Sequence, residues 1–380
     1  MVWVACVLAG IALFFAAGTV AWQTPWLGLL GSLGGYVPGW LVVAAVLGFA
    51  AGVAAWVSTP SIWAVVSAAV SVWAAAVGIR VIADQRRVLA DLGVSTRFRD
   101  YFGPHRSSTT GPDEVVTYGP VDGFTPRMGV YRPEPGVSPA PVVVHVHGGG
   151  WEAGDETSDA WFARHLAEAG FLVFTPTYTY AAEGRPTWDL APQQIACALV
   201  EARALSERYG GDPGRFHLTG SSAGGNLAPL VANRLAAGET FGRDSDSLPD
   251  ITAIAITIPA VDPGFAEGNA YVPAGTVGRR LVRAFLGGTP DQVPERYEAV
   301  DAGAYLDAKC PPALVVYGPN DWLVPAQAIL NYILRARLRG AQVRPVAIPW
   351  TGHLMGLSGA ADRAIAQLTV EWFNAHAPRS

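Results

Sequence analysis

Two glycine-rich motifs, each placed directly after a run of β-forming residues, constrain the fold of this chain most. Gly220-Ser221-Ser222-Ala223-Gly224 follows such a run at residues 215–219 and precedes a helix predicted over residues 226–236. A G-x-S-x-G sequence between a strand and a helix forces a tight turn that exposes its central serine. Glycines flank that serine because side chains there would collide with the adjoining strand and helix. The motif therefore predicts an α/β fold with Ser222 as a nucleophile at the end of a strand.

The second motif is H-G-G-G-W at residues 147–151, and it follows a buried-strand run at residues 142–146. Consecutive glycines present backbone N–H groups without side-chain obstruction, which suits a site that binds a developing oxyanion. A phosphate-binding loop is disfavoured because neither G-x-G-x-x-G nor G-x-x-x-x-G-K-[ST] is present. We expect His147 and Gly148 to support the loop, with His147 shaping it by hydrogen bonding. The predicted oxyanion-hole donors are the backbone N–H groups of Gly149, Gly150 and Ala223.

A serine nucleophile needs a base and an acid that orients the base, and in this type of fold the chain order is Ser, Asp or Glu, His. Asp321 lies just after a strand predicted at residues 313–317, and His353 lies just after a β-prone stretch at residues 343–348. Both therefore belong to loops at the carboxyl ends of strands, where such sites assemble. The sequence predicts Ser222 as nucleophile, His353 as general acid and base, and Asp321 as the orienting acid.

Other residues of the same types fit these roles less well. The chain has seven histidines: His105, His145, His147, His165, His217, His353 and His376. All but two precede Ser222, and His376 is expected at the solvated end of a helix over residues 361–375. Among the acids, Asp262 follows a strand-like run at residues 251–258, but this run comes one strand before the strand that is expected to carry the acid. Asp301 and Asp307 are typical of surface or capping positions.

With these motifs in place, residues 100–380 resemble an α/β-hydrolase of the hormone-sensitive-lipase-like group, which includes bacterial carboxylesterases and arylacetamide deacetylases. The residues that carry the resemblance are HGGGW at 147–151, GSSAGGNLA at 220–228, YGPNDWLVP at 317–325 and GHLMG at 352–356, preceded by YGGDPGRFHLTG at 209–220. The chain departs from the group in having Ser221, rather than an acidic residue, just before the nucleophile. Its acid loop is closer to that of general small-ester hydrolases.

The first 79 residues carry no charged side chain, and Arg80 is the first one. Three apolar stretches, at about 2–22, 40–57 and 62–82, each approach the roughly 20 residues that cross the hydrocarbon core of a bilayer. Tryptophans lie at their predicted ends, as interfacial aromatic belts require. Gly48 and Gly52 form a G-x-x-x-G pair that either permits close helix contact or reflects a helix rich in small residues. We therefore predict a membrane anchor over residues 1–82.

The sidedness of this anchor follows from its basic residues. A cleavable signal peptide is disfavoured because the extreme N-terminus has no Lys or Arg and two further spans follow. Basic residues cluster only after the third span, at Arg80, Arg86, Arg87, Arg97 and Arg99. The positive-inside rule then places the catalytic domain in the cytoplasm and the N-terminus outside. The predicted protein is a multi-pass integral membrane protein.

Residues 83–112 form a predicted juxtamembrane linker that opens with a helical continuation over residues 84–92. Residues 113–380 form the catalytic domain, with an antiparallel strand pair at 115–118 and 128–131 followed by alternating strands and helices. This alternation predicts a mostly parallel sheet with helices on both faces. Residues 263–300 interrupt it and are predicted to contribute to a cap over the pocket. Within them, a helix near residues 277–286 has an apolar side and a basic side. It either lies on the membrane or packs on the domain.

Composition narrows the function. The net charge of −5 belongs entirely to residues 80–380, which argues against nucleic-acid binding because that function favours a basic face. The three cysteines, Cys6, Cys197 and Cys310, show neither disulfide nor zinc spacing. The predicted chemistry needs no metal or organic cofactor. The resemblance implies a serine carboxylesterase or lipase that acts on small-molecule or lipid esters, and the anchor favours lipophilic ones. An amidase, deacetylase or formamidase with the same triad, or a non-catalytic interaction protein, remains the alternative.

Overall fold

The computed structural model describes residues 1–104, 111–119, 124–134 and 139–376. Within these residues, eight strands form one sheet in the order β1-β2-β4-β3-β5-β6-β7-β8. The strands are β1 (Glu114–Thr117), β2 (Arg127–Tyr131), β3 (Ala140–Val146), β4 (Leu172–Pro176), β5 (Gly211–Ser221), β6 (Ile251–Thr257), β7 (Ala313–Tyr317) and β8 (Val343–Ala347). The predicted antiparallel opening is observed, because β1 pairs with β2 and β2 with β4 in that sense. All pairings from β4 to β8 are parallel.

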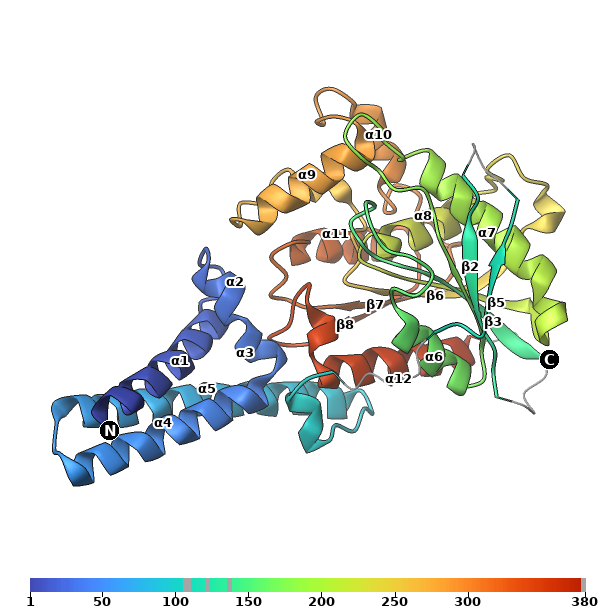
Figure 1. Cartoon of the computed structure of the whole chain (residues 1–380). Coiled ribbons are helices and arrows are strands. Elements are labelled where there is room, and N and C mark those ends of the chain that lie inside the picture. Colours follow the sequence, from blue (N-terminus) through green and yellow to red (C-terminus); the bar gives the residue numbers. More distant parts are fainter. Residues whose placement is uncertain (105–110, 120–123, 135–138, 377–380) are drawn as a thin grey trace.

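Helices cover both faces of this sheet, as the alternation of elements predicts (Figure 1). The helices of the α/β domain are α6 (Ala160–Glu168), α7 (Leu190–Ser206), α8 (Gly224–Ala236), α9 (Ala274–Leu286), α10 (Pro294–Val300), α11 (Ala326–Leu338) and α12 (Gly359–Ala375). Residues of α7, α8 and α11 share one buried cluster, and residues of α6 and α12 share the other. Alternate residues of β3 enter the two clusters, with Val142 and Val144 on one face and Val143 on the other. The parallel strands are therefore buried on both sides.

Three long apolar helices precede this domain and pack together as a bundle that projects from one side of it (Figure 1). They are α1 (Val2–Val20), α4 (Pro38–Ser58) and α5 (Ile62–Asp91), with the short α2 (Leu27–Gly31) and α3 (Leu33–Tyr36) between the first two. All three are long and apolar enough to cross a membrane. The first two agree with the predicted stretches within two residues, whereas α5 continues nine residues beyond the predicted third span.

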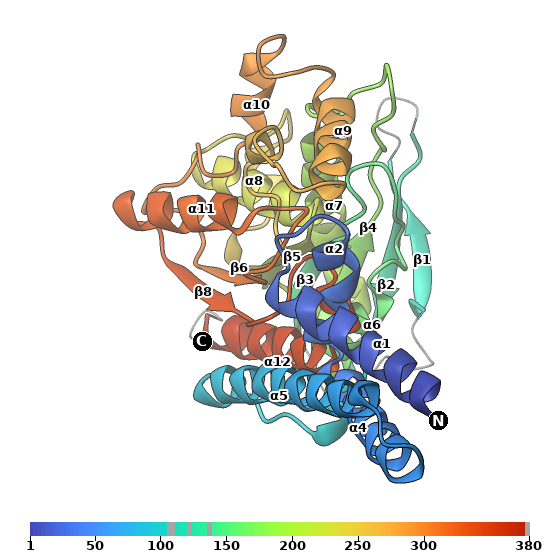
Figure 2. The same cartoon turned by 90° about the vertical axis from the view of Figure 1, so that its left-hand side faces the viewer.

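The extra turns of α5 run along the α/β domain. Leu89 is fully buried in the same cluster as residues of α12, and the two helices lie side by side in Figure 2. Asp100, beyond the end of α5, is also fully buried and pairs with Arg363 of α12 at 2.7 and 3.0 Å. The start of the predicted linker over residues 83–112 is thus helical and packed. Residues 105–110 of that linker lie outside the described residues, as do residues 377–380.

Helix α8 differs locally from its expected form. Helix α8 begins at Gly224, two residues before the predicted start, so that Pro229 lies inside the helix rather than in its first turn. Residues 224–233 of α8 are buried, and this packing offsets the backbone hydrogen bond that a proline cannot donate. Helix α9 packs on the domain, since Phe285 and Leu286 are fully buried. Two arginines of its basic side form ion pairs, Arg280 with Glu152 and Arg283 with Glu267.

Candidate active site

Ser222 lies in the turn between β5 and α8, with a φ of 53° that non-glycine residues seldom adopt. The turn is held from both sides, because the Ser222 N–H donates to Thr257 O at 3.0 Å and the Ala260 N–H donates to Ser222 O at 3.1 Å. The flanking glycines have no room for side chains. A Cβ at Gly224 would lie 2.0 Å from Val146 O, and one at Gly220 would lie 2.2 Å from Gly224 O. Local backbone geometry thus presents the Ser222 hydroxyl at the carboxyl end of the sheet.

The structure brings the other two predicted residues to this hydroxyl from the loops that follow β7 and β8. His353 Nε2 lies 2.9 Å from Ser222 Oγ, and His353 Nδ1 lies 3.0 Å from Asp321 Oδ2. The second oxygen of Asp321 accepts hydrogen bonds from the N–H groups of Leu323 and Val324 at 2.9 and 2.8 Å. The side chain of Asp321 is 1% exposed and that of His353 is 11% exposed. A buried carboxylate that two backbone N–H groups hold in place keeps an imidazole in one orientation.

The glycine motif lies beside Ser222, since a Cβ at Gly148 would be 3.2 Å from Ser222 Cβ. Gly149 and Gly150 have φ angles of 106° and 62°, a left-handed backbone conformation that residues with a side chain seldom adopt. Among the described residues, the N–H groups of Gly149, Gly150 and Ala223 have no protein acceptor. Ala223 directly precedes α8, where the backbone N–H groups and the helix dipole favour negative charge. These donors can therefore act on an oxyanion next to Ser222.

His147 is buried beneath the glycine loop and does not line the cavity beside Ser222. Its Nδ1 donates a hydrogen bond to Gly148 O at 2.7 Å, and its ring stacks on Tyr178 with centroids 4.6 Å apart. Burial lowers the pKa of His147, and because a carbonyl oxygen only accepts, His147 Nδ1 carries the proton of this hydrogen bond. A Cβ at Gly154 would lie 2.3 Å from this nitrogen. The geometry agrees with a loop-shaping role.

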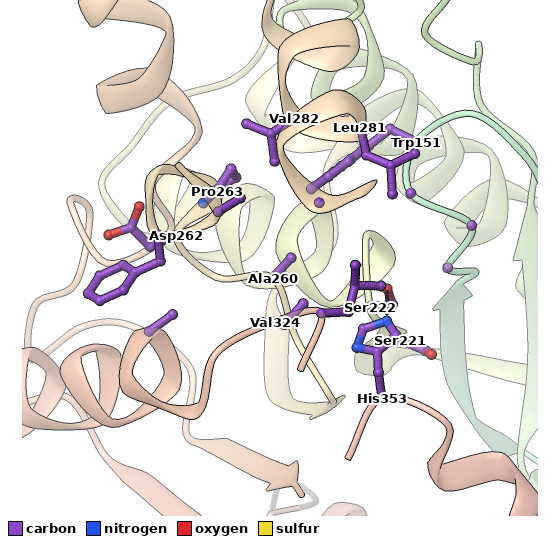
Figure 3. Close-up of a pocket in the computed structure, with 18 of the residues that line it drawn as sticks. Trp151, Ser221, Ser222, Ala260, Asp262, Pro263, Leu281, Val282, Val324 and His353 are labelled. Atoms are coloured by element: carbon purple, nitrogen blue, oxygen red, sulfur yellow. Dashed lines mark hydrogen bonds between the residues drawn. The ribbon is translucent and has the colours of Figure 1, made fainter. Parts of the chain in front are cut away.

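A cavity of about 430 Å³ opens above Ser222 and His353 (Figure 3). Its walls are mainly apolar and come from the glycine loop, from residues after β6, from α9 and from the acid loop. They include Trp151, Ala260, Pro263, Leu281, Val282 and Val324. Leu281 and Val282 come from the region predicted as a cap, and Trp151 stacks on Phe285 of the same helix at 4.6 Å. Such a cavity accommodates a lipophilic group next to the serine.

Asp262, considered above as a rival acid, lies in the wall of this cavity rather than beside His353. Its Oδ1 accepts a hydrogen bond from the Gly264 N–H at 3.0 Å, which caps a short helical turn. Burial and then the negative charge of Asp301 raise the pKa of Asp262 to about 6. Asp301 itself pairs with Arg335 at 2.7 Å, and Asp307 accepts from turn N–H groups, as expected of capping residues.

Three of the other histidines make contacts away from Ser222, and His165 lies on α6. His145 pairs with Asp159 at 3.0 Å, and His217 stacks on Phe373 with centroids 4.5 Å apart. His376 follows α12, and its Nδ1 donates to Trp372 O at 2.8 Å. His105 lies outside the described residues. Sequence reasoning missed one neighbour of the triad, Tyr36, which is buried close to Asp321 although it belongs to α3 in the N-terminal segment. No local motif marks it.

Comparisons with known proteins place this geometry in context. Residues 128–332 match the BD-FAE family. The chain is 29% identical over 256 residues to the probable carboxylic ester hydrolase LipM of Mycobacterium tuberculosis, covering 62% of this chain and 54% of that protein. It is 27% identical over 221 residues to the esterase LipC of the same organism, covering 57% and 53%. The chain thus spans about half the length of these curated relatives.

Among solved structures, the fold resembles an acetyl ester-xyloside bifunctional hydrolase from Caldicellulosiruptor lactoaceticus. The TM-score is 0.57 at 20% sequence identity, and the match covers 71% of this chain and 98% of that one. At this identity the likeness supports the α/β-hydrolase fold.

Proposed function

The chain belongs to the BD-FAE family, and from that premise we propose that it is a serine carboxylesterase that hydrolyses lipophilic esters through an acyl-enzyme while anchored in a membrane. The observation that carries the proposal is the chain of hydrogen bonds from Ser222 Oγ through His353 to Asp321, at 2.9 and 3.0 Å, at the floor of an apolar cavity. Similarity to carboxylic ester hydrolases supports the reaction class.

In the proposed reaction, Ser222 Oγ attacks the ester carbonyl carbon while its proton passes to His353 Nε2. The N–H groups of Gly149, Gly150 and Ala223 stabilise the oxyanion, each contributing about 3 kcal/mol in the transition state. Collapse of this intermediate releases the alcohol, which takes its proton from His353. Water then attacks the acyl-enzyme by the same route and releases the carboxylic acid. Asp321 holds His353 in the required tautomer and stabilises the imidazolium.

The preference for lipophilic esters rests on two features of the chain. The cavity walls are mainly apolar. The three helices that could cross a membrane are joined to the α/β domain that carries the site, and they project from one side of it (Figure 1). Esters that partition into a bilayer are concentrated there, so an anchored enzyme meets them at a high local concentration.

The first test measures hydrolysis of nitrophenyl esters from acetyl to palmitoyl by the detergent-solubilised full chain and its Ser222→Ala variant. We expect Ser222→Ala to lower kcat by roughly 10⁴-fold or more, because the nucleophile is lost while the binding groups remain. Ser245→Ala, which changes an exposed serine remote from the cavity, serves as the matched control and keeps full activity.

A fluorophosphonate label identifies the reactive serine independently of the ester chosen. Mass spectrometry of the labelled protein is expected to place the adduct on Ser222. If Ser222→Ala retains the ester hydrolysis of the wild type, the assignment of the nucleophile is refuted. If the wild type cleaves arylamides but no ester, the amidase alternative is favoured. If it cleaves neither substrate, a non-catalytic role is favoured.

A further inference from the structure

The loop that carries His353 is contacted by the N-terminal helices. Trp350, three residues before His353, has a φ of 64°, a conformation that a bulky residue keeps only when its surroundings enforce it. Its indole N–H donates to Asp84 Oδ2 on α5 at 3.0 Å. The neighbouring Gln85 is fully buried, and its amide donates to Pro349 O at 3.1 Å and to Gly35 O at 2.8 Å. One side chain of α5 therefore ties α3 to the histidine loop.

Helix α3 meets the same loop directly. A Cβ at Gly35 would lie 2.1 Å from Trp350 O, so the two backbones touch. The next residue, Tyr36, is 1% exposed and lies close to Gly352 and Leu354, the residues on either side of His353. Burial, together with the negative charge of nearby Asp321, raises the pKa of Tyr36, so that its hydroxyl stays neutral.

We propose that Gln85 is a positioning residue for the reaction, because it fixes the histidine loop to α3 and so sets the imidazole of His353 between Ser222 and Asp321. Tyr36 supports the same loop by packing. The inference rests on the proposed function, since it concerns the base of that reaction. It makes the segment between the first two apolar helices a part of the active site rather than a tether.

The physical reason is the sensitivity of proton transfer to geometry. A shift of about 1 Å in a catalytic group, caused by a change at a distance, can lower the rate by about 100-fold. The loop that carries His353 contains a strained residue, Trp350, and contacts α3 and α5 at Pro349 and Trp350. Loss of the Gln85 amide removes the donor that Pro349 O and Gly35 O share, which favours a shifted loop.

The kinetic test compares Gln85→Leu, which removes the amide that bridges Gly35 and Pro349, with wild type in the solubilised full chain. We expect kcat to fall by about 10- to 100-fold while KM stays within about twofold, because the cavity walls that bind the ester are unchanged. Tyr271→Phe is the matched control. Tyr271 also lies where the two parts meet, against Trp22, but makes no contact with the histidine loop. It keeps the wild-type kcat.

Hydrogen–deuterium exchange gives a readout that does not require activity. Peptides covering residues 349–357 are expected to exchange faster in Gln85→Leu than in wild type and Tyr271→Phe, with other peptides unchanged. An unchanged kcat, a rise in KM alone, or unchanged exchange would overturn the inference. Hydrolysis that does not depend on Ser222 would refute the proposed function instead, and the exchange data would still decide whether Gln85 holds the loop.

Discussion

Gly149 shows how much of the site depends on a single absent side chain. Its φ is 106°, and a Cβ there would lie 1.9 Å from Ala153 O, so an alanine cannot be accommodated without moving the loop. Because the loop presents proposed oxyanion donors, we expect Gly149→Ala to lower kcat by about 100-fold or more. Nitrophenyl ester kinetics measure this. Gly238, with a φ of 88° and open space around its Cβ, provides the control. Equal losses in Gly149→Ala and Gly238→Ala would mean that backbone strain alone explains the effect.

Asp262 provides a residue-level prediction on pH. Its pKa of about 6 lies above the ordinary value of 3.8, so between these pH values the folded state binds more protons than the unfolded state. Stability contributed by this group therefore falls as the pH rises from 3.8 to 6. Asp262→Asn cannot ionise and still accepts from Gly264. We expect it to raise the free energy of unfolding by about 1–2 kcal/mol at pH 8 and to change it little at pH 4. Thermal unfolding at several pH values tests this, and a pH-independent gain would contradict it.

At the scale of elements, the glycines of α4 decide how closely the apolar helices approach. A Cβ at Gly48 would lie 2.6 Å from Ser71 Oγ on α5 and 3.2 Å from Ala9 N on α1. One at Gly52 would lie 3.0 Å from Ala64 O. Of the two interpretations of the G-x-x-x-G pair, the structure therefore favours close helix contact.

A bulky residue at Gly48 should separate these helices. We expect Gly48→Leu to destabilise the bundle by about 1–3 kcal/mol, which is typical of overpacking, and to lower the melting temperature in detergent. Gly10→Leu is the matched control, since a Cβ at Gly10 meets nothing within 4 Å. Equal melting temperatures for the two variants would contradict the packing argument.

At the scale of the whole molecule, the three apolar helices and the basic residues after them predict on which side of the membrane the α/β domain lies. Three crossings would place the N-terminus and the α/β domain on opposite sides of the membrane, with the domain on the side of the arginines. We expect a fluorescent protein fused to the C-terminus to fold in the cytoplasm and alkaline phosphatase fused to the N-terminus to be active. Phosphatase activity from a C-terminal fusion would reverse the orientation.

The local parts of the protein follow from the sequence alone. The turn at Ser222, the glycine loop and the order of Ser222, Asp321 and His353 depend on short stretches whose conformation is set by neighbouring residues. The apolar helices follow from composition, because hydrophobic length is a one-dimensional property. The position of Asp262 in the cavity wall and its raised pKa do not follow, since burial depends on residues from other elements.

Only the tertiary structure decides how the two parts meet. The sequence predicts an anchor that ends near residue 82, yet α5 continues to Asp91 and brings Asp84 and Gln85 to a loop more than 260 residues away. Gln85 carries no signal in its own segment, because its partners are the backbone carbonyls of Gly35 and Pro349 and backbone groups have no sequence identity. Contacts of this kind depend on packing between distant elements, where each residue's surroundings are set by the whole chain.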